Sequence, residues 1–306
     1  MKHYPVMLAE VLDALALKDG AVYVDATFGN GGYTEAMLKA AKCKVIAIDR
    51  DPSVKAKADE LKKKYGERFE FVAGKFGDLS SLVKEKIDGV VFDIGVSSMQ
   101  LDEAERGFSF AKDAPLDMRM SSKGETAAEV VNNMGEKELA DVIYEFGEEK
   151  KSRHIAAKIA LYRKTKKIET TKELAEIIYT VIRKKFGEID PATRTFQALR
   201  IYVNDELGEL RRGLEGATSL LKPKGRLVVV DFHSLEDRIV KNFFNEKAGK
   251  EESVSRYMPE MKKTKDIIFN KISKAIKPSE KEIIENPRSR SAKLRYAVMS
   301  CVGDLK

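Results

Sequence analysis

The most constraining feature of this chain is an apolar segment followed by a glycine-rich turn and a helix-forming segment. Ala21–Val24 is apolar and β-prone, Asp25–Gly32 contains three glycines, and Tyr33–Lys42 has helix-forming composition. A strand, a glycine turn and a helix in this order present backbone N–H groups to a nucleotide-like ligand. The unit predicts an α/β protein with a parallel sheet, because strands joined through a helix run in the same direction.

A second apolar segment, Lys44–Ile48, is followed directly by Asp49. The distance from the glycine turn to this carboxylate matches the spacing of about 20 residues that is typical of nucleotide-binding units. A carboxylate at the end of the second strand can accept hydrogen bonds from both hydroxyls of a ribose. We therefore expect Asp49 to bind the ribose of a nucleoside-containing ligand.

The spacing of the glycines distinguishes between nucleotide ligands. Dinucleotide sites have the pattern G-x-G-x-x-G, which lets the backbone approach a pyrophosphate, and Asp25–Gly32 lacks this pattern. An acidic turn that begins with Asp25 suits a cationic or zwitterionic ligand, such as S-adenosylmethionine with its sulfonium and its amino acid group. The alternative is a glycine turn with a purely structural role. The presence of Asp49 makes this alternative less favoured.

Apolar, β-prone segments alternate with helical ones over the N-terminal third of the chain. Phe69–Ala73 and Ile87–Phe92 are the third and fourth predicted strands. Such alternation is typical of a parallel sheet with right-handed connections. Ligands of these sheets bind beyond the carboxyl ends of the strands, so Phe76 and Asp93 are expected at the same edge as Asp49.

The alternation stops after the fourth strand. Apolar residues then recur at helical spacing, as in Leu139, Val142 and Ile143, and a long helix is expected from Asp190–Pro191 to Leu221. Arg226–Val230 is the next predicted strand. The sequence thus predicts a sheet domain formed by residues 1–104 and 196–306, interrupted by an all-helical domain of residues 105–195.

The C-terminal part is expected to complete the sheet. Ile267–Phe269 and Leu294–Met299 are predicted to form a hairpin that contains one reversed strand, joined by the polar segment Lys274–Arg290. The end of this segment, Asn286–Ser291, is predicted to be a mobile basic loop suited to a phosphate backbone. A solvated loop without a ligand is an equally favoured interpretation.

Composition narrows the class of protein further. The 56 Lys and Arg against 49 Asp and Glu give a net charge of +7, which weakly favours an anionic partner. Cys43 and Cys301 lack metal-type spacing, so neither a disulfide framework nor a metal site is expected, and Cys43 is predicted to pack in the core. No apolar run approaches about 18 residues, and no signal peptide is evident. We expect a cytoplasmic enzyme without a membrane span.

Distinctive segments occur along the whole chain: His3–Leu8, Asp25–Gly32, Ala47–Pro52, Phe92–Asp102, Ala104–Phe110, Pro115–Met120, Pro191–Ala198, Phe232–Val240 and Asn286–Ser291. In these segments the sequence resembles the bacterial RsmH/MraW family of small-subunit ribosomal RNA cytidine-N4 methyltransferases. The resemblance covers essentially all 306 residues. Tyr33 stands where the family usually has His, and Met99 where it usually has Pro.

The resemblance implies a Rossmann-like class I S-adenosylmethionine-dependent methyltransferase with an inserted helical domain. It implies methylation of the exocyclic N4 of one cytidine in the decoding centre of 16S ribosomal RNA. The implied partner is this RNA or the small ribosomal subunit, and a homodimer is suggested. The implied cofactor contacts are Gly31, Gly32, Tyr33, Asp49, Phe76, Asp93 and Gln100.

The chemistry of the cytosine amine suggests two catalytic candidates. The N4 atom is a poor nucleophile because its lone pair is delocalised into the ring, so catalysis needs in-line approach and an acceptor for an N4–H bond. Asp93 can provide this acceptor, or it can bind the cofactor while backbone carbonyls accept the bond. His233, after the fifth predicted strand, can hold the base or relay its proton, although a lone His is more often structural.

Several polar residues are predicted to bind the RNA. Asp117 and Arg119 enter the helical domain and Arg194 leaves it, and with Ser234 they are expected to position a flipped cytidine or its phosphates. Ordinary ion pairs are the alternative for the three charged residues. Basic runs at 150–153, 163–167 and 183–185 predict that the helical domain is the RNA platform, although each run alone is more simply a solvated face.

Three other classes of protein compete with this interpretation. A nicotinamide dehydrogenase requires the glycine pattern that is absent here. A methyltransferase acting on DNA or on a small amine is a closer alternative, and the basic helical domain favours a polynucleotide substrate without naming which one. A non-catalytic RNA-binding assembly factor would not need the intact set of Gly31, Gly32, Asp49 and Asp93.

Overall fold

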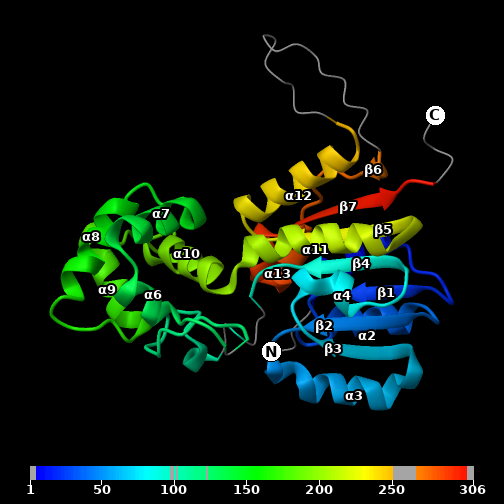
Figure 1. The fold of residues 1–306 in the computed structure, drawn as a ribbon, viewed down its shortest axis with the longest axis horizontal. Helices are drawn as coiled ribbons and strands as arrows, with labels where there is room; N and C mark the ends of the chain where they lie inside the picture. The colour runs from blue at the N-terminus through cyan, green and yellow to red at the C-terminus, as the bar shows by residue number, and fades with distance from the viewer. Residues whose placement is uncertain (1–4, 97–99, 101–102, 122, 251–266, 302–306) are drawn as a thin grey trace, which may run out of the picture. The chain divides into compact units, whose positions relative to one another are not determined.

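The chain divides into two units, shown in Figure 1: a sheet unit, Met1–Gly95 with Leu207–Lys306, and a helical unit, Val96–Glu206. This computed structural model describes residues 5–96, 100, 103–121, 123–250 and 267–301. Residues 96–104 and 196–206, which the sequence analysis assigned to the sheet domain, group with the helices. The helical unit extends to Glu206 because α10 (Ala192–Asn204) is a single helix that packs against other helices of that unit along its length.

The sheet unit contains seven strands in the order β3-β2-β1-β4-β5-β7-β6. The strands are β1 (Val22–Asp25), β2 (Lys44–Asp49), β3 (Phe69–Ala73), β4 (Ile87–Asp93), β5 (Leu221–Asp231), β6 (Phe269–Ile272) and β7 (Lys293–Met299). The strands β1 to β5 are parallel to one another, and β7 is antiparallel to both β5 and β6. The predicted parallel sheet with one reversed strand near its edge is confirmed.

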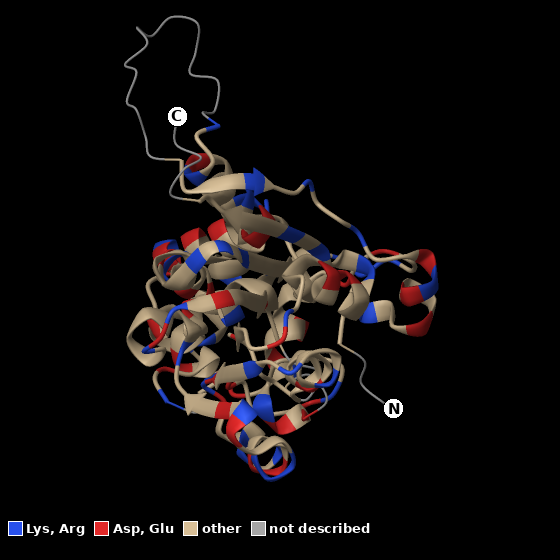
Figure 2. Cartoon of the chain, turned by 90° about the vertical axis from the view of Figure 1, so that its right-hand side faces the viewer, with Lys and Arg blue, Asp and Glu red and all other residues tan. Residues whose placement is uncertain are grey.

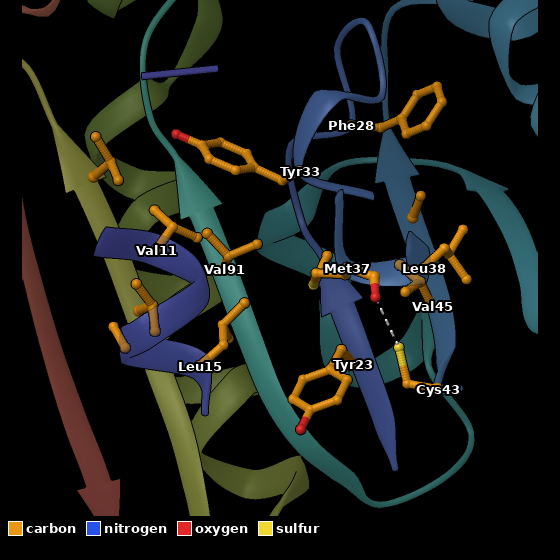
Figure 3. Packing of buried hydrophobic residues seen from close by; sticks show 14 of the residues in the cluster. Val11, Leu15, Tyr23, Phe28, Tyr33, Met37, Leu38, Cys43, Val45 and Val91 are labelled. Carbon is orange, nitrogen blue, oxygen red and sulfur yellow. Dashed lines mark hydrogen bonds between the residues drawn. The ribbon is translucent and has the colours of Figure 1, made fainter. Parts of the chain in front are cut away.

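Alternate residues of each strand pack on opposite faces of the sheet. Tyr23, Val45 and Val91 lie in a cluster with α1 (Leu8–Leu15), α2 (Gly32–Ala40) and α3 (Lys55–Tyr65), part of which is drawn in Figure 3. The residues next to them in each strand face the other cluster, formed with α4 (Leu79–Leu82), α11 (Glu206–Leu220) and α12 (Ser234–Lys247). Both faces are therefore covered, which is why the strands are almost continuously apolar.

One of the two cysteines, Cys43, packs in the core as predicted. Cys43 is buried in the first of these clusters, where its thiol lies 3.6 Å from the carbonyl oxygen of Met37 (Figure 3), and Cys301 is half-buried. Neither cysteine is in a disulfide. Among the described residues, no cluster of His, Cys, Asp and Glu could hold a metal ion, and no helix is long and apolar enough to cross a membrane.

The helical unit has its own apolar core. Its described helices of seven or more residues are α6 (Ala127–Asn133), α7 (Glu136–Gly147), α8 (Ser152–Tyr162), α9 (Thr171–Val181) and α10. The helices α6 and α9 begin with capping boxes, in which a Thr side chain and a Glu three residues later each accept the backbone N–H of the other. Of the apolar stripe that predicted α7, Leu139 and Ile143 lie in one buried cluster to which all five helices contribute, whereas Val142 is buried outside it.

Two local predictions are wrong. The long helix expected up to Leu221 is broken after α10, because Asp205 adopts a left-handed conformation with φ of 49° and α11 starts at the next residue. The segment Asn286–Ser291 is not a loop but contains the 3₁₀ helix η5 (Pro287–Ser291), in which Ser289 is fully buried. It follows a short helix, α13 (Glu280–Glu285).

The packing of α11 on the sheet depends on Gly213. A Cβ atom at this position would lie 2.9 Å from Cδ2 of Phe76 and 3.2 Å from the carbonyl oxygen of Phe76. We expect Gly213→Ala to lower the free energy of unfolding by up to about 2 kcal/mol, because overpacking outweighs the better helix propensity of Ala. Urea unfolding measures the difference.

The matched control is Gly216→Ala on the same helix. Its Cβ would lie 3.3 Å from the nearest atom, the backbone nitrogen of Ser80, so this substitution should cost less than Gly213→Ala. Equal stabilities of the two variants would contradict the packing described for Gly213.

Candidate active site

The glycine turn between β1 and α2 has a conformation that requires two of its glycines. Gly31 caps α2 in the left-handed region with φ of 72°, where residues with a Cβ are strained. At Gly32, a Cβ would lie 2.3 Å from Cγ of Pro5. Gly32 and Tyr33 are the first two residues of α2, so their N–H groups have no acceptor within the helix and suit an anionic group such as a carboxylate.

Asp25, at the end of β1, holds this turn from inside the protein. Its fully buried carboxylate accepts hydrogen bonds from the hydroxyl of Thr34 at 2.7 Å and from the N–H of Thr34 at 3.2 Å. Burial raises the pKa of Asp25 to about 6, although the bonds from Thr34 and Thr27 lower it. Asp25 is therefore a structural support of the turn that adds negative charge to this edge of the sheet.

Asp49, at the end of β2, is where the ribose contact was predicted. One carboxylate oxygen accepts the N–H of Gly29 at 2.7 Å, and the other accepts the N–H of Asp51 at 2.9 Å. Burial raises the pKa of Asp49 despite these bonds. The carboxylate is fixed between the glycine turn and the end of β2, with lone pairs left to accept ligand hydroxyls.

Asp93, at the end of β4, has the least compensated carboxylate of the three. The residue is partly exposed, but its Oδ1 atom is buried and has no hydrogen-bond partner in the part of the chain that the structure describes. Burial, with the charges of Asp25 and Glu236, raises the pKa of Asp93 to about 8. Its backbone N–H donates to the hydroxyl of Thr27 at 2.7 Å, which connects the ends of β1 and β4.

The three carboxylates end three adjacent strands, β2, β1 and β4. No Lys or Arg is among the main influences on the pKa of Asp25 or Asp93 in the described part of the chain, and the pKa of Asp49 is lowered by Arg50 in addition to its two backbone hydrogen bonds. A positively charged ligand would lower these pKa values and restore the ionised forms. The residues present therefore fit S-adenosylmethionine, whose sulfonium and ammonium groups are cationic, better than they fit an anionic dinucleotide.

Phe76 begins the 3₁₀ helix η3 (Phe76–Asp78) after β3, at the same edge. Its ring is half-buried and packs edge-on against Phe92, with 5.7 Å between the ring centroids. This arrangement leaves part of a flat apolar surface accessible, which suits an adenine ring.

The buried side chain of Glu209 contacts the loops that follow β2 and β3. The sequence analysis did not identify this residue. This fully buried residue of α11 accepts from Arg50 at 2.7 Å, and Lys75 lies 3.5 Å from the same oxygen. Its other oxygen, Oε2, is buried without a hydrogen-bond partner among the described residues. Glu209 thus links the loop after β2 to the loop after β3, a pairing across about 160 residues that no local sequence pattern indicates.

The side chain of Tyr33 forms a hydrogen bond within the protein. It is buried, and its hydroxyl donates to the carbonyl oxygen of Val6. Together with the contact between Gly32 and Pro5, this bond fixes the segment before α1 against the start of α2. The other departure from the family pattern, Met99, lies outside the described residues.

His233 is the N-cap of α12 and is paired with Glu236, a residue that the sequence analysis also missed. The N–H of Glu236 approaches Nδ1 at 3.4 Å, and Nε2 lies 3.1 Å from Oε1 of Glu236, close enough for an ion pair if the imidazole is protonated but not aligned as a hydrogen bond. The carboxylate of Glu236 also accepts the backbone N–H groups of Phe232 and His233. This arrangement favours a positioning role for His233 over that of a free base.

Four of the other predicted residues lie in the helical unit, and Ser234 lies in the sheet unit. In the helical unit, Gln100 is buried, and the guanidinium of Arg119 binds the carboxylate of Asp117 at 2.7 and 2.8 Å. Arg194, in the same unit, donates to the carbonyl oxygen of Glu148 and lies 3.8 Å from Glu149. Ser234, in the sheet unit, is exposed at the start of α12.

The loop that carries Asp117 and Arg119 is held by two hydrogen bonds from one residue of the helical unit. Asn204, at the end of α10, accepts the N–H of Met120 at 2.9 Å and donates to the carbonyl oxygen of Met118 at 2.7 Å. Met118 has a left-handed backbone with φ of 63°, which is unusual for a residue with a side chain. The loop therefore has a fixed, strained conformation of the kind that often occurs at functional sites.

Comparison with known proteins agrees with this geometry. The family model described as "MraW methylase family" matches residues 1–300. The chain is 55% identical over 303 residues to "Ribosomal RNA small subunit methyltransferase H" of Rickettsia akari (strain Hartford), covering 96% of this chain and 97% of the relative. The protein of the same name from Rickettsia massiliae (strain Mtu5) is 56% identical over 301 residues, with the same two coverages.

A relative from another genus has nearly equal similarity. The protein of the same name from Parvibaculum lavamentivorans (strain DS-1 / DSM 13023 / NCIMB 13966) is 54% identical over 300 residues, covering 96% of this chain and 88% of the relative. The family model and these relatives each span almost the whole chain, so the resemblance seen in the sequence is confirmed. The chain belongs to the MraW methylase family.

Proposed function

We propose that this chain transfers the methyl group of S-adenosylmethionine to the exocyclic N4 of a cytidine in the decoding centre of 16S ribosomal RNA. Membership of a methylase family and the names of relatives more than 50% identical support the reaction class and the small-subunit RNA. The observation that carries the proposal is the set of buried carboxylates at the ends of β1, β2 and β4. They favour a cationic nucleoside, and S-adenosylmethionine is one.

The cofactor would be held by groups from three loops. The N–H groups of Gly32 and Tyr33 would bind its carboxylate, Asp49 would accept its ribose hydroxyls, and Phe76 would lie against its adenine. Gly31 would allow the turn to approach the ligand, and Gln100 stays a predicted cofactor contact. When bound, S-adenosylmethionine supplies an electrophilic methyl group on a positively charged sulfur.

Asp93 is the residue best suited to act on the amine. In the ionised form its unpartnered Oδ1 would accept an N4–H hydrogen bond and draw electron density toward the nitrogen. The same oxygen can take the proton that N4 loses, because methyl transfer would remove the sulfonium charge and let the pKa of this carboxyl return toward its value of about 8 in the free protein. His233, capped by Glu236, would fix the position of Phe232–Ser234 next to the end of β5.

The proposed substrate contacts are the fixed loop of Asp117 and Arg119, with Arg194 and Ser234. The guanidinium of Arg119 and the hydroxyl of Ser234 are suited to phosphate or to a splayed base. The small ribosomal subunit is the proposed partner, and the homodimer implied by the family resemblance stays a prediction.

Purified protein incubated with labelled S-adenosylmethionine and small subunits should place label on 16S RNA, and nuclease digestion should yield N4-methylcytidine. Asp49→Ala should weaken S-adenosylmethionine binding by roughly tenfold or more, because hydrogen bonds to a charged group are lost. Label on DNA but not on small-subunit RNA would contradict the substrate, and failure of the wild type to bind the cofactor would favour a non-catalytic RNA-binding factor.

Cofactor binding should depend on pH. Because the pKa of Asp93 is raised to about 8 in the free protein, a bound cation must displace its proton. Affinity for S-adenosylmethionine should therefore rise between pH 6 and 8, by at most about tenfold per pH unit for one proton. S-adenosylhomocysteine, which lacks the sulfonium charge, should show a weaker dependence in the same calorimetric titration. Identical pH profiles for the two ligands would refute the charge argument.

Asp93→Asn should separate stability from activity. The raised pKa means that the wild-type carboxyl stabilises the fold when protonated, and that this contribution is lost as the pH rises from about 4 through about 8. The amide has no such loss, so the variant should have a higher melting temperature than the wild type at pH 9. The difference should be roughly 2–4 °C for each kcal/mol of stability that the wild-type carboxyl has lost. Near pH 4 the two melting temperatures should match. Methyl transfer should be nearly abolished. A variant that melts below the wild type at pH 9 would contradict the proposed state of Asp93.

A further inference from the structure

The positive charge of this protein is concentrated in the C-terminal third of its sequence. Residues 207–306 contain 22 Lys and Arg against 14 Asp and Glu, whereas residues 1–95 contain 15 of each. The helical unit, residues 96–206, contains 19 against 20. Figure 2 colours these charges along the chain. The basic runs that predicted an RNA platform in the helical unit are thus balanced by acidic residues of the same unit.

Five exposed cations of the C-terminal third form what we call the basic edge. They are Lys271, Lys274, Lys277, Lys281 and Arg290. None of them has an ion pair or a hydrogen bond within the part of the chain that the structure describes, although Lys271 lies 5.9 Å from the ring centroid of Tyr296. By contrast, three lysines of α3 are paired: Lys55 with Asp59, Lys57 with Glu60 and Lys64 with Glu35.

The backbone that carries the basic edge is fixed along the border of the sheet. Lys271 lies in β6, the last strand of the sheet. The next residues continue along β7, because Ser273 donates to the carbonyl oxygen of Tyr296 and Ile276 forms a bridge with Leu294. Three residues of extended chain advance about 10 Å, so successive lysines are separated enough to contact different phosphates.

The basic edge leads to the carboxyl ends of the parallel strands, where the candidate active site lies. Because β7 is antiparallel to β5, its first residue, Lys293, is paired with Asp231 at the end of β5. The helices α13 and η5, which carry Lys281 and Arg290, come directly before β7. Glu282 of α13 accepts the backbone N–H of Met7 at 2.6 Å, next to the segment that packs on the glycine turn.

We propose that the basic edge binds the phosphate backbone of the RNA substrate, as a contact separate from the residues that surround the target cytidine. This proposal rests on the proposed function, since it takes the polyanion to be the RNA that is methylated. Exposed cations without protein partners suit a polyanion, because each one can neutralise a phosphate and release a counterion. Their position on an open border lets an extended strand approach without entering a pocket.

The test uses a variant in which Lys274, Lys277, Lys281 and Arg290 are all replaced by Gln. Its matched control replaces four lysines of α3, Lys55, Lys57, Lys62 and Lys64, by Gln, which removes the same net charge. Binding of 16S RNA is measured against salt concentration, and methyl transfer gives kcat and KM for small subunits. Cofactor affinity is measured separately by calorimetry.

The basic-edge variant should have a KM for RNA raised roughly tenfold or more, and its slope of log affinity against log salt should fall by about 3, as expected for four lost contacts to single-stranded phosphates. Its kcat at saturation and its cofactor affinity should equal those of the wild type, and the α3 control should change little. An unchanged KM and salt slope would overturn the proposal, and so would equal losses in both variants.

Lysines on an edge strand can also serve only to prevent pairing with a second sheet. In that case the variant would self-associate in sedimentation experiments while KM and salt slope stay unchanged, which also overturns the proposal. The single variant Arg290→Gln, outside the strand, should still lower the salt slope by about 0.7. If the wild type binds RNA with this salt dependence but methylates no RNA, the proposed function is rejected. The assignment of the basic edge as an RNA-binding surface then still holds.

Discussion

Three carboxyl groups whose ionisation is poorly compensated, at the carboxyl edge of the sheet, are the constraint on which the site depends. The parallel order of β2, β1 and β4 places Asp49, Asp25 and Asp93 at the ends of adjacent strands. Burial of these groups opposes ionisation, and the pKa values of Asp25 and Asp93 rise to about 6 and about 8. A cation completes this arrangement, so the fold is prepared for a positively charged donor before it arrives.

The elements around this charge fix the geometry of the loops. Gly31 gives the turn its left-handed conformation, and Gly32 leaves room for Pro5. Glu209 holds the loops after β2 and β3 by binding Arg50 and Lys75. A buried ion pair of this kind contributes little net stability, because desolvation offsets the attraction between the charges. Its value is positional, since both loops carry groups proposed to contact the cofactor.

Much of the sheet unit could be predicted from sequence because its signals are local. The segment Phe69–Ala73 is a strand with the predicted limits, and the glycine turn and Asp49 occur where the pattern placed them. The pairing of Glu209 with Arg50 and the break at Asp205 were not predicted, because the first depends on a contact between distant residues and the second on one backbone angle. The capping box of His233 and Glu236 is local, but His is not among the usual N-cap residues, so the sequence pattern did not indicate it. The excess of positive charge in residues 207–306 is a property of the sequence alone, whereas the short basic runs at 150–153, 163–167 and 183–185 pointed to the helical unit.

The central claim is that Asp93 is protonated in the free protein and ionises when the donor binds. Infrared difference spectroscopy at pH 7 measures this directly, because a protonated carboxyl has a carbonyl band distinct from the carboxylate bands. Addition of S-adenosylmethionine should remove one protonated-carboxyl band from the wild type, and Asp93→Asn should lack that band before and after addition. Asp231, whose pKa burial also raises to about 8, should give a band that persists in both proteins. A wild-type spectrum without the band that Asp93→Asn lacks, or persistence of that same band in the saturated complex, would contradict the account.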